Sequence, residues 1–251
     1  MRSLLVLGLA GIVTVASVAC GSSTAPLSPT LGVSTITGLT LSVTVAGVGA
    51  TVQQAATVAL SNGHTPAIMS GFTSDTPSVA TITPGGLMTG VSIGDVTISV
   101  DYQGFHASQK VRVLPDYSGT FQHGTYTVDS CQETDGFAAE GFCASIMAQV
   151  PAGSNFTIAM SNAQSADLTS LTGQFYLGSV LGSSTGTVSP LGVLSYAGSF
   201  LYTSTRRMDF QNFTATSPSV GHISGHFQQV WTDSAVTGSS VWSCTIIDLA
   251  R

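Results

Sequence analysis

Short stretches of alternating apolar and polar residues recur along most of the chain. From Leu39 to Val45 and from Gln54 to Leu60 the apolar residues occupy every second position. This is the period of a β-strand that buries one face. No long segment has the 3.6-residue period of an amphipathic helix, so doubly wound and (β/α)-barrel architectures are excluded. The pattern predicts an all-β protein.

The first folded region is expected over residues 36–115. After the two stretches above, strands are expected at Val79–Thr83, Leu87–Thr89, Asp95–Tyr102 and Ala107–Leu114, each bounded by Pro or Gly. About seven short strands within roughly eighty residues favour an antiparallel β-sandwich.

Residues 116–251 are expected to form a second all-β domain. About eight to ten consecutive strands are more than one open sheet holds easily, and closure into an antiparallel up-and-down β-barrel removes the exposed edges. In shape alone this arrangement looks like the lipocalin and calycin barrels, although no lipocalin motif is present. The expected strands are 117–128, 144–149, 156–161, 171–177, 186–188, 193–196, 200–203, 208–213, 222–231 and 241–247.

Two motifs in the first region point to a family. The segments 74–82 (SDTPSVATI) and 86–98 (GLMTGVSIGDVTI) resemble the bacterial immunoglobulin-like domain of group 2, found in intimin- and invasin-like surface proteins. Phe72 stands where that family usually carries Trp or Tyr, and we expect it to fill the same core position. The resemblance implies a spacer or an adhesive module and brings no catalytic residues with it.

The N-terminus has the layout of an export signal. One positive charge and an apolar run precede Ser17-Val-Ala-Cys20, and the run is short for a membrane-spanning helix. The end of this run resembles a bacterial lipobox, which implies cleavage after residue 19 and lipid on Cys20. Residues 20–35, with two prolines and many small polar residues, are expected to be a flexible tether.

Charge narrows the range of partners. Only 7% of the residues are charged, and the net charge is −6. Nucleic-acid binding needs a clustered cationic surface, whereas the only adjacent basic residues are Arg206 and Arg207. We therefore expect no nucleic-acid partner.

Three cysteines remain once Cys20 is assigned to lipidation. In an oxidising compartment we prefer a disulfide between Cys131 and Cys143, which would stabilise the intervening loop by up to about 3 kcal/mol. The alternative, Cys131 with Cys244, would join the first and last strands of the second domain.

We expect neither a metal nor a cofactor. No Cys-x-x-Cys pair of the zinc type occurs. Glu133, Asp135 and Glu140 lie together between the cysteines, but their spacing is not that of an EF-hand, and a solvated acidic loop is preferred over a Ca²⁺ site.

Two further patterns could suggest catalysis. His222 and His226 share one strand face but would stand roughly 13 Å apart, too far to bind one ion. Residues 182–186 (GSSTG) match the Gly-x-Ser-x-Gly of hydrolases, but no helix is expected after them, as that motif requires. No nucleophile, base and orienting group can be assembled, so we expect a protein that is not an enzyme.

Many aromatic residues lie in the second region, and alternation sends some of them inward. By default they fill the barrel; alternatively they line a cavity for an apolar ligand, with Phe175, Tyr202, Phe227 and Trp231 as the candidates.

Three hypotheses follow. The first is a lipid-anchored envelope protein, expected at the outer membrane, with a structural, adhesive or binding role. In the second, the barrel carries or senses a small apolar ligand. The third, a hydrolase with an unrecognised site, has the least support.

Overall fold

The structure is a computed structural model that describes residues 34–149 and 155–251. The predicted signal segment, Cys20 and nearly all of the predicted tether lie outside these residues. No helix within the described ranges is long and apolar enough to cross a membrane.

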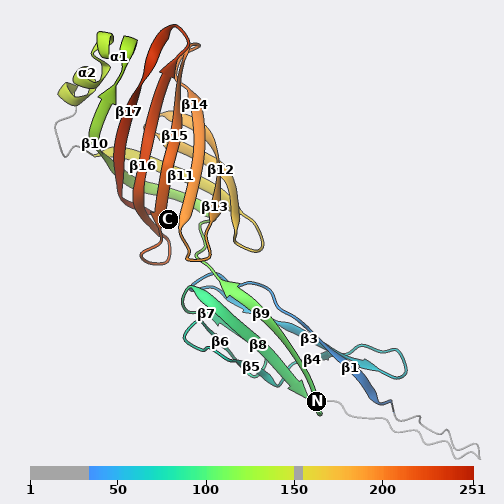
Figure 1. The fold of residues 1–251 in the computed structure, drawn as a ribbon. Helices are drawn as coiled ribbons and strands as arrows, with labels where there is room; N and C mark the ends of the chain where they lie inside the picture. The colour runs from blue at the N-terminus through green and yellow to red at the C-terminus, as the bar shows by residue number, and fades with distance from the viewer. Residues whose placement is uncertain (1–33, 150–154) are drawn as a thin grey trace, which may run out of the picture. The chain divides into compact units, whose positions relative to one another are not determined.

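The N-terminal domain is an antiparallel β-sandwich built from three small sheets, with strand orders β1-β3-β4, β2-β7-β6 and β5-β8-β9 (Figure 1). The strands are β1 Ile36–Ser42, β2 Thr51–Gln53, β3 Ala55–Leu60, β4 Ala67–Ile68, β5 Phe72–Ser74, β6 Ala80–Ile82, β7 Leu87–Gly90, β8 Gly94–Tyr102 and β9 Phe105–Val113.

Small apolar residues form most of the sandwich core. Val96, Ile98 and Val100 alternate along β8 and are almost fully buried. Phe72 is 3% exposed and belongs to the same cluster, as its place in the family pattern predicted.

The C-terminal domain is a closed antiparallel barrel, which confirms the predicted fold class (Figure 1). Within the described residues its strands pair in chain order, and β10 pairs with β17 to complete the ring. The strands are β10 Gly119–Glu133, β11 Phe156–Gln164, β12 Ser170–Leu177, β13 Val180–Val188, β14 Leu194–Leu201, β15 Arg206–Thr216, β16 His222–Asp233 and β17 Val236–Ala250.

The strand predicted at 144–149 is wrong. This segment belongs to a pair of short helices, α1 Asp135–Glu140 and α2 Phe142–Gln149, separated by Gly141 in the left-handed conformation (φ 65°). Ala, Met and Gln favour helix over strand, and glycine is the usual residue at such a helix end. The stretch is too short for the sequence pattern to reveal a helical period.

Two other boundaries differ from expectation. The stretches at 193–196 and 200–203 belong largely to one strand, β14, and the GSSTG segment lies inside β13. Glycine is accepted within these strands because an aromatic ring occupies the space a side chain would need. A Cβ on Gly182 would lie 2.1 Å from Phe175 Cζ, and one on Gly198 would lie 2.7 Å from Phe175 Cε1.

Candidate functional site

One part of the barrel interior is filled by phenylalanine rings. Phe175 is fully buried, and its ring centroid lies 4.2 Å from that of Phe210. Phe210 in turn contacts Phe227 at 5.0 Å, and Phe213 stacks on Phe227 at 5.8 Å. These contacts leave this region as a packed core.

Another part of the interior contains a cavity of about 190 Å³. The described residues that line it come from every barrel strand except β15, or from the turns beside those strands. All of them are uncharged. They are Tyr126, Phe156, Thr157, Leu177, Gly178, Val180, Phe200, Tyr202, Gln229, Trp231 and Trp242.

Strand alternation explains how β16 contributes to both parts. Phe227, Gln229 and Trp231 are two residues apart and therefore share the inward face. All three are at least nine-tenths buried. Phe227 belongs to the filled part, whereas Gln229 and Trp231 line the cavity.

Trp231 is surrounded by other rings. Its ring centroid lies 5.5 Å from Trp242, 5.7 Å from Phe200 and 5.7 Å from Tyr202. Tyr202 is 60% exposed, so the cavity reaches the surface beside it. The ring of Tyr126 stacks on Phe156 at 5.1 Å.

Few polar groups face this apolar space. The Gln229 side-chain amide donates a hydrogen bond from Nε2 to Tyr126 Oη at 3.1 Å. Burial raises the pKa of Tyr126, an effect that this hydrogen bond partly opposes, so the phenol remains protonated. A protonated phenol that accepts one bond still has an O–H to donate.

The indole N–H groups of Trp242 and Trp231 differ in hydrogen bonding. Trp242 donates from Nε1 to Ser240 Oγ at 2.9 Å. Within the described residues, the buried Nε1–H of Trp231 has no hydrogen-bond acceptor. Leaving a buried donor unpaired costs about 1–3 kcal/mol, so this group is unusual in a native interior.

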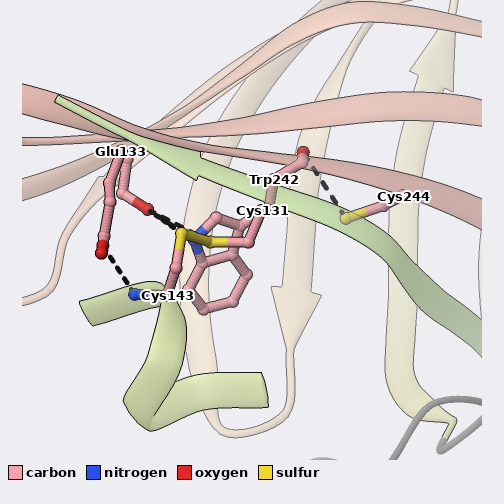
Figure 2. Close-up of a disulfide and its surroundings, with 6 residues drawn as sticks. Cys131, Glu133, Cys143, Trp242 and Cys244 are labelled. Carbon is pink, nitrogen blue, oxygen red and sulfur yellow. Dashed lines mark hydrogen bonds between the residues drawn. A yellow bond between two sulfur atoms is a disulfide. The ribbon is translucent and has the colours of Figure 1, made fainter. Parts of the chain in front are cut away.

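A disulfide links helix α2 to strand β10 of the barrel, close to Trp242. It joins Cys131 of β10 to Cys143 of α2, the pair preferred from the sequence. Figure 2 shows the disulfide beside the Trp242 indole, with the Cys143 backbone N–H donating to Glu133 Oε2 at 2.7 Å. Both cysteine sulfurs contact Ser240 Oγ, at 3.5 and 3.6 Å.

Arg206 secures the same helices from β15. Its guanidinium carbon lies 5.1 Å from the ring centroids of both Phe137 and Phe142. It also donates to Glu140 at 2.9 Å and to Asp233 at 3.0 Å. Phe142 is thereby held with its ring 5.9 Å from that of Trp231.

Cys244 is a free and buried thiol. In the β10–β17 register it lies opposite Val128, whereas Cys131 lies opposite Trp242, so the alternative disulfide is not formed. Burial raises the pKa of Cys244 to about 12, and the thiol therefore stays protonated and unreactive at neutral pH.

The four residues proposed as ligand-lining separate into two pairs. Tyr202 and Trp231 line the cavity, whereas Phe175 and Phe227 lie in the filled core. Sequence reasoning missed Gln229, although its parity with Phe227 and Trp231 could have identified it as an inward polar residue.

The remaining candidates lie apart from the cavity. His222 Nδ1 is 3.0 Å from an Asp248 carboxylate oxygen in an exposed pair, and His226 Nδ1 is 3.0 Å from Thr245 Oγ1. Across the described ranges, no three His, Cys, Asp or Glu side chains are grouped in a way that could hold a metal ion.

Comparison with known proteins gives one family assignment, for part of the chain. No curated protein matches it. Among solved structures it is similar to domains 4–9 of the surface layer protein SbsC, with 11% identity and a TM-score of 0.26. That similarity covers 86% of this chain and 47% of SbsC domains 4–9, so this chain spans about half their length.

Residues 36–111 match the bacterial Ig-like domain of group 2. This match indicates a cell-surface or envelope protein with a structural or adhesion-type role. The N-terminal domain of this chain is a bacterial Ig-like domain.

Proposed function

We propose that this protein is an exported lipoprotein, anchored through Cys20 at the outer membrane, whose barrel binds a small apolar molecule without catalysis. In this proposal the Ig-like domain is a spacer that carries the barrel away from the membrane.

The anchoring part rests on the N-terminal sequence. Ser17-Val-Ala-Cys20 follows an apolar run, and a tether-like stretch follows the cysteine. Lipid chains contribute about 0.8 kcal/mol per buried CH₂, so two or more of them give stable attachment. The Ig-like domain supports a position at the cell surface or envelope.

The binding part rests on the cavity. An uncharged space of about 190 Å³, ringed by aromatic side chains and reaching the surface at Tyr202, has the character of a small-molecule site. An engineered apolar cavity of about 150 Å³ is already large enough to bind benzene.

The anchor is tested by expressing the full precursor and its Cys20→Ser variant in a bacterial host. We expect the native protein to be cleaved before Cys20 and to carry the added mass of acyl chains, and the variant to keep its signal segment and to carry no acyl mass. A native protein without added acyl mass on Cys20 would contradict lipid anchoring at this cysteine.

Binding is tested on residues 21–251, expressed without the predicted signal segment and without Cys20. Native mass spectra are recorded after exposure to an apolar extract of the host membrane. We expect a bound mass that disappears when Val180, at the cavity lining, is changed to Arg. A protein that stays folded and takes up no mass at any extract concentration would leave only the structural or adhesive role.

A further inference from the structure

We propose that the barrel docks on a lipid surface through a short row of apolar side chains on its outer face, beside the opening of the cavity. This inference goes beyond the binding function proposed above, because docking does not require an occupied cavity. The Ig-like domain is proposed to hold the barrel away from the anchoring membrane, so the surface meant here is a second one, such as an opposed membrane.

Three apolar side chains lie side by side on neighbouring strands. Tyr176 of β12 is paired with Leu181 of β13. Leu181 lies two residues before Ser183 and Leu201 two residues after Ser199. Because these serines are paired, both leucines lie on the same outer face and at the same level. Leu181 is 48% and Leu201 is 69% exposed, and Tyr176 is half-buried. We call Tyr176, Leu181 and Leu201 the apolar row.

The cavity opens next to the apolar row. Each residue of the row has a direct neighbour in the chain that lines the cavity, namely Leu177, Val180 and Tyr202. Leu177 and Val180 face inward because side chains alternate along a strand. Tyr202 is 60% exposed and lies at the opening. A lipid surface that contacts the row therefore adjoins the opening of the cavity.

The apolar surface is only one row deep. The next outward residues on the same three strands are Gln174, Ser183 and Ser199, which pair with one another in turn. They lie about 7 Å further along the strands, since two residues span that length. The Tyr176 hydroxyl is directed to this polar level and donates to Gln174 Oε1 at 3.5 Å. An apolar surface of this depth suits the boundary between headgroups and acyl chains, into which apolar protein faces insert by about 5–10 Å.

The small size of the row favours lipid over a protein partner. A stable protein interface buries roughly 800 Å² on each partner, contributed by about 20–30 residues. Three side chains do not supply such an area, whereas insertion into lipid needs only that exposed apolar groups leave water. Tyrosine is also enriched where membranes meet water.

The residues at the two ends of the row fit a layer of phospholipid headgroups. Arg207 of β15 lies opposite Leu201, and its side chain is 52% exposed. It binds Asp209 at 2.7 Å, so this cation is already neutralised when the row inserts. The guanidinium has five N–H donors, and those that Asp209 does not use can donate to a lipid phosphate. At the other end, the uncharged Ala159 of β11 lies opposite Tyr176.

The test measures how much of the protein, as residues 21–251, sediments with phosphatidylcholine vesicles. This protein lacks the proposed anchor. The row variant combines Leu181→Ser with Leu201→Ser, at exposed positions where the fold should tolerate serine. The matched control combines Leu191→Ser with Ile247→Ser, two apolar residues outside the row that are 80% and 50% exposed. Unchanged melting temperatures show that both double variants remain folded.

We expect the native protein and the control to bind the vesicles with similar partition coefficients. The row variant should bind at least about tenfold more weakly, because two leucines no longer leave water. A native protein that does not bind, or a row variant that binds like the control, would overturn the docking. Sedimentation velocity without vesicles tests a second copy of the chain as the occupant, and a dimer that the row variant abolishes would replace the lipid surface.

These outcomes are distinguishable from failure of the proposed binding function. A native protein that takes up a mass from the membrane extract but does not sediment with vesicles has the ligand site without the docking surface, which overturns this inference alone. A native protein that sediments through the row and takes up no mass docks on lipid without carrying a ligand, which supports this inference alone.

Discussion

Both parts of the barrel interior are lined by aromatic side chains, but one part is a packed core and the other contains a cavity. In the filled part, Phe175 lies against Gly182 and Gly198, which leave room for its ring. In the hollow part, the ring of Trp231 contacts those of Trp242 and Phe200 at 5.5 and 5.7 Å, separations similar to those in the filled part, yet a cavity of about 190 Å³ remains beside them. Aromatic content alone therefore does not distinguish a core from a binding site. The space that remains beside the rings does.

The strongest test of this contrast is to truncate one aromatic side chain in the filled part and one at the cavity rim. Phe175→Ala should lower the free energy of unfolding by about 3–5 kcal/mol, because it empties a packed site. Tyr202→Ala, at a 60% exposed position on the cavity rim, should change it by less than about 0.5 kcal/mol. Urea denaturation measures both. Similar losses for the two variants would show that the interior is uniformly packed.

The disulfide gives the next largest effect. Replacing both Cys131 and Cys143 by Ser should cost about 2–3 kcal/mol, since the bond closes a short loop between residues separated by 12 positions. The loss should also weaken ligand binding, because α2 places Phe142 against Trp231. Cys244→Ala, which leaves the disulfide intact, is the control and should retain ligand binding. Unchanged binding in the double variant would separate the helices from the site.

A further effect concerns pH. Burial raises the pKa of Cys244 from 9.0 to about 12, so folding favours its neutral form. The resulting stability is fully present below pH 9 and is lost as the pH rises towards 12, because the unfolded thiol ionises first. Thermal unfolding between pH 8 and pH 11 should therefore show a decline that is shallower in Cys244→Ala. Identical slopes would show that this thiol does not contribute.

Strand periodicity and the number of consecutive strands were sufficient to predict the barrel, because closure removes the exposed edges of so long a strand series. Tyr202 and Trp231 could be selected as lining residues from strand periodicity, and so could Gln229. The position of the cavity could not be predicted, because it depends on the register between neighbouring strands, which for example places Gly182 of β13 beside Phe175 of β12. The helices were missed because their turns are too short to establish a period, and their position depends on Arg206 and the disulfide.

The pairing of β10 with β17 has a consequence for the order of folding. Trp242 lies opposite Cys131 in this pairing, and Cys143 is only 12 residues from Cys131. As the chain is exported N-terminus first, Cys131 and Cys143 can form their disulfide early. The barrel cannot close until its last strand, β17, is available. Closure should thus be the slow, late step, because non-local strand pairing folds slowly. Until then, β10 and β16 present open edges that could pair with other chains.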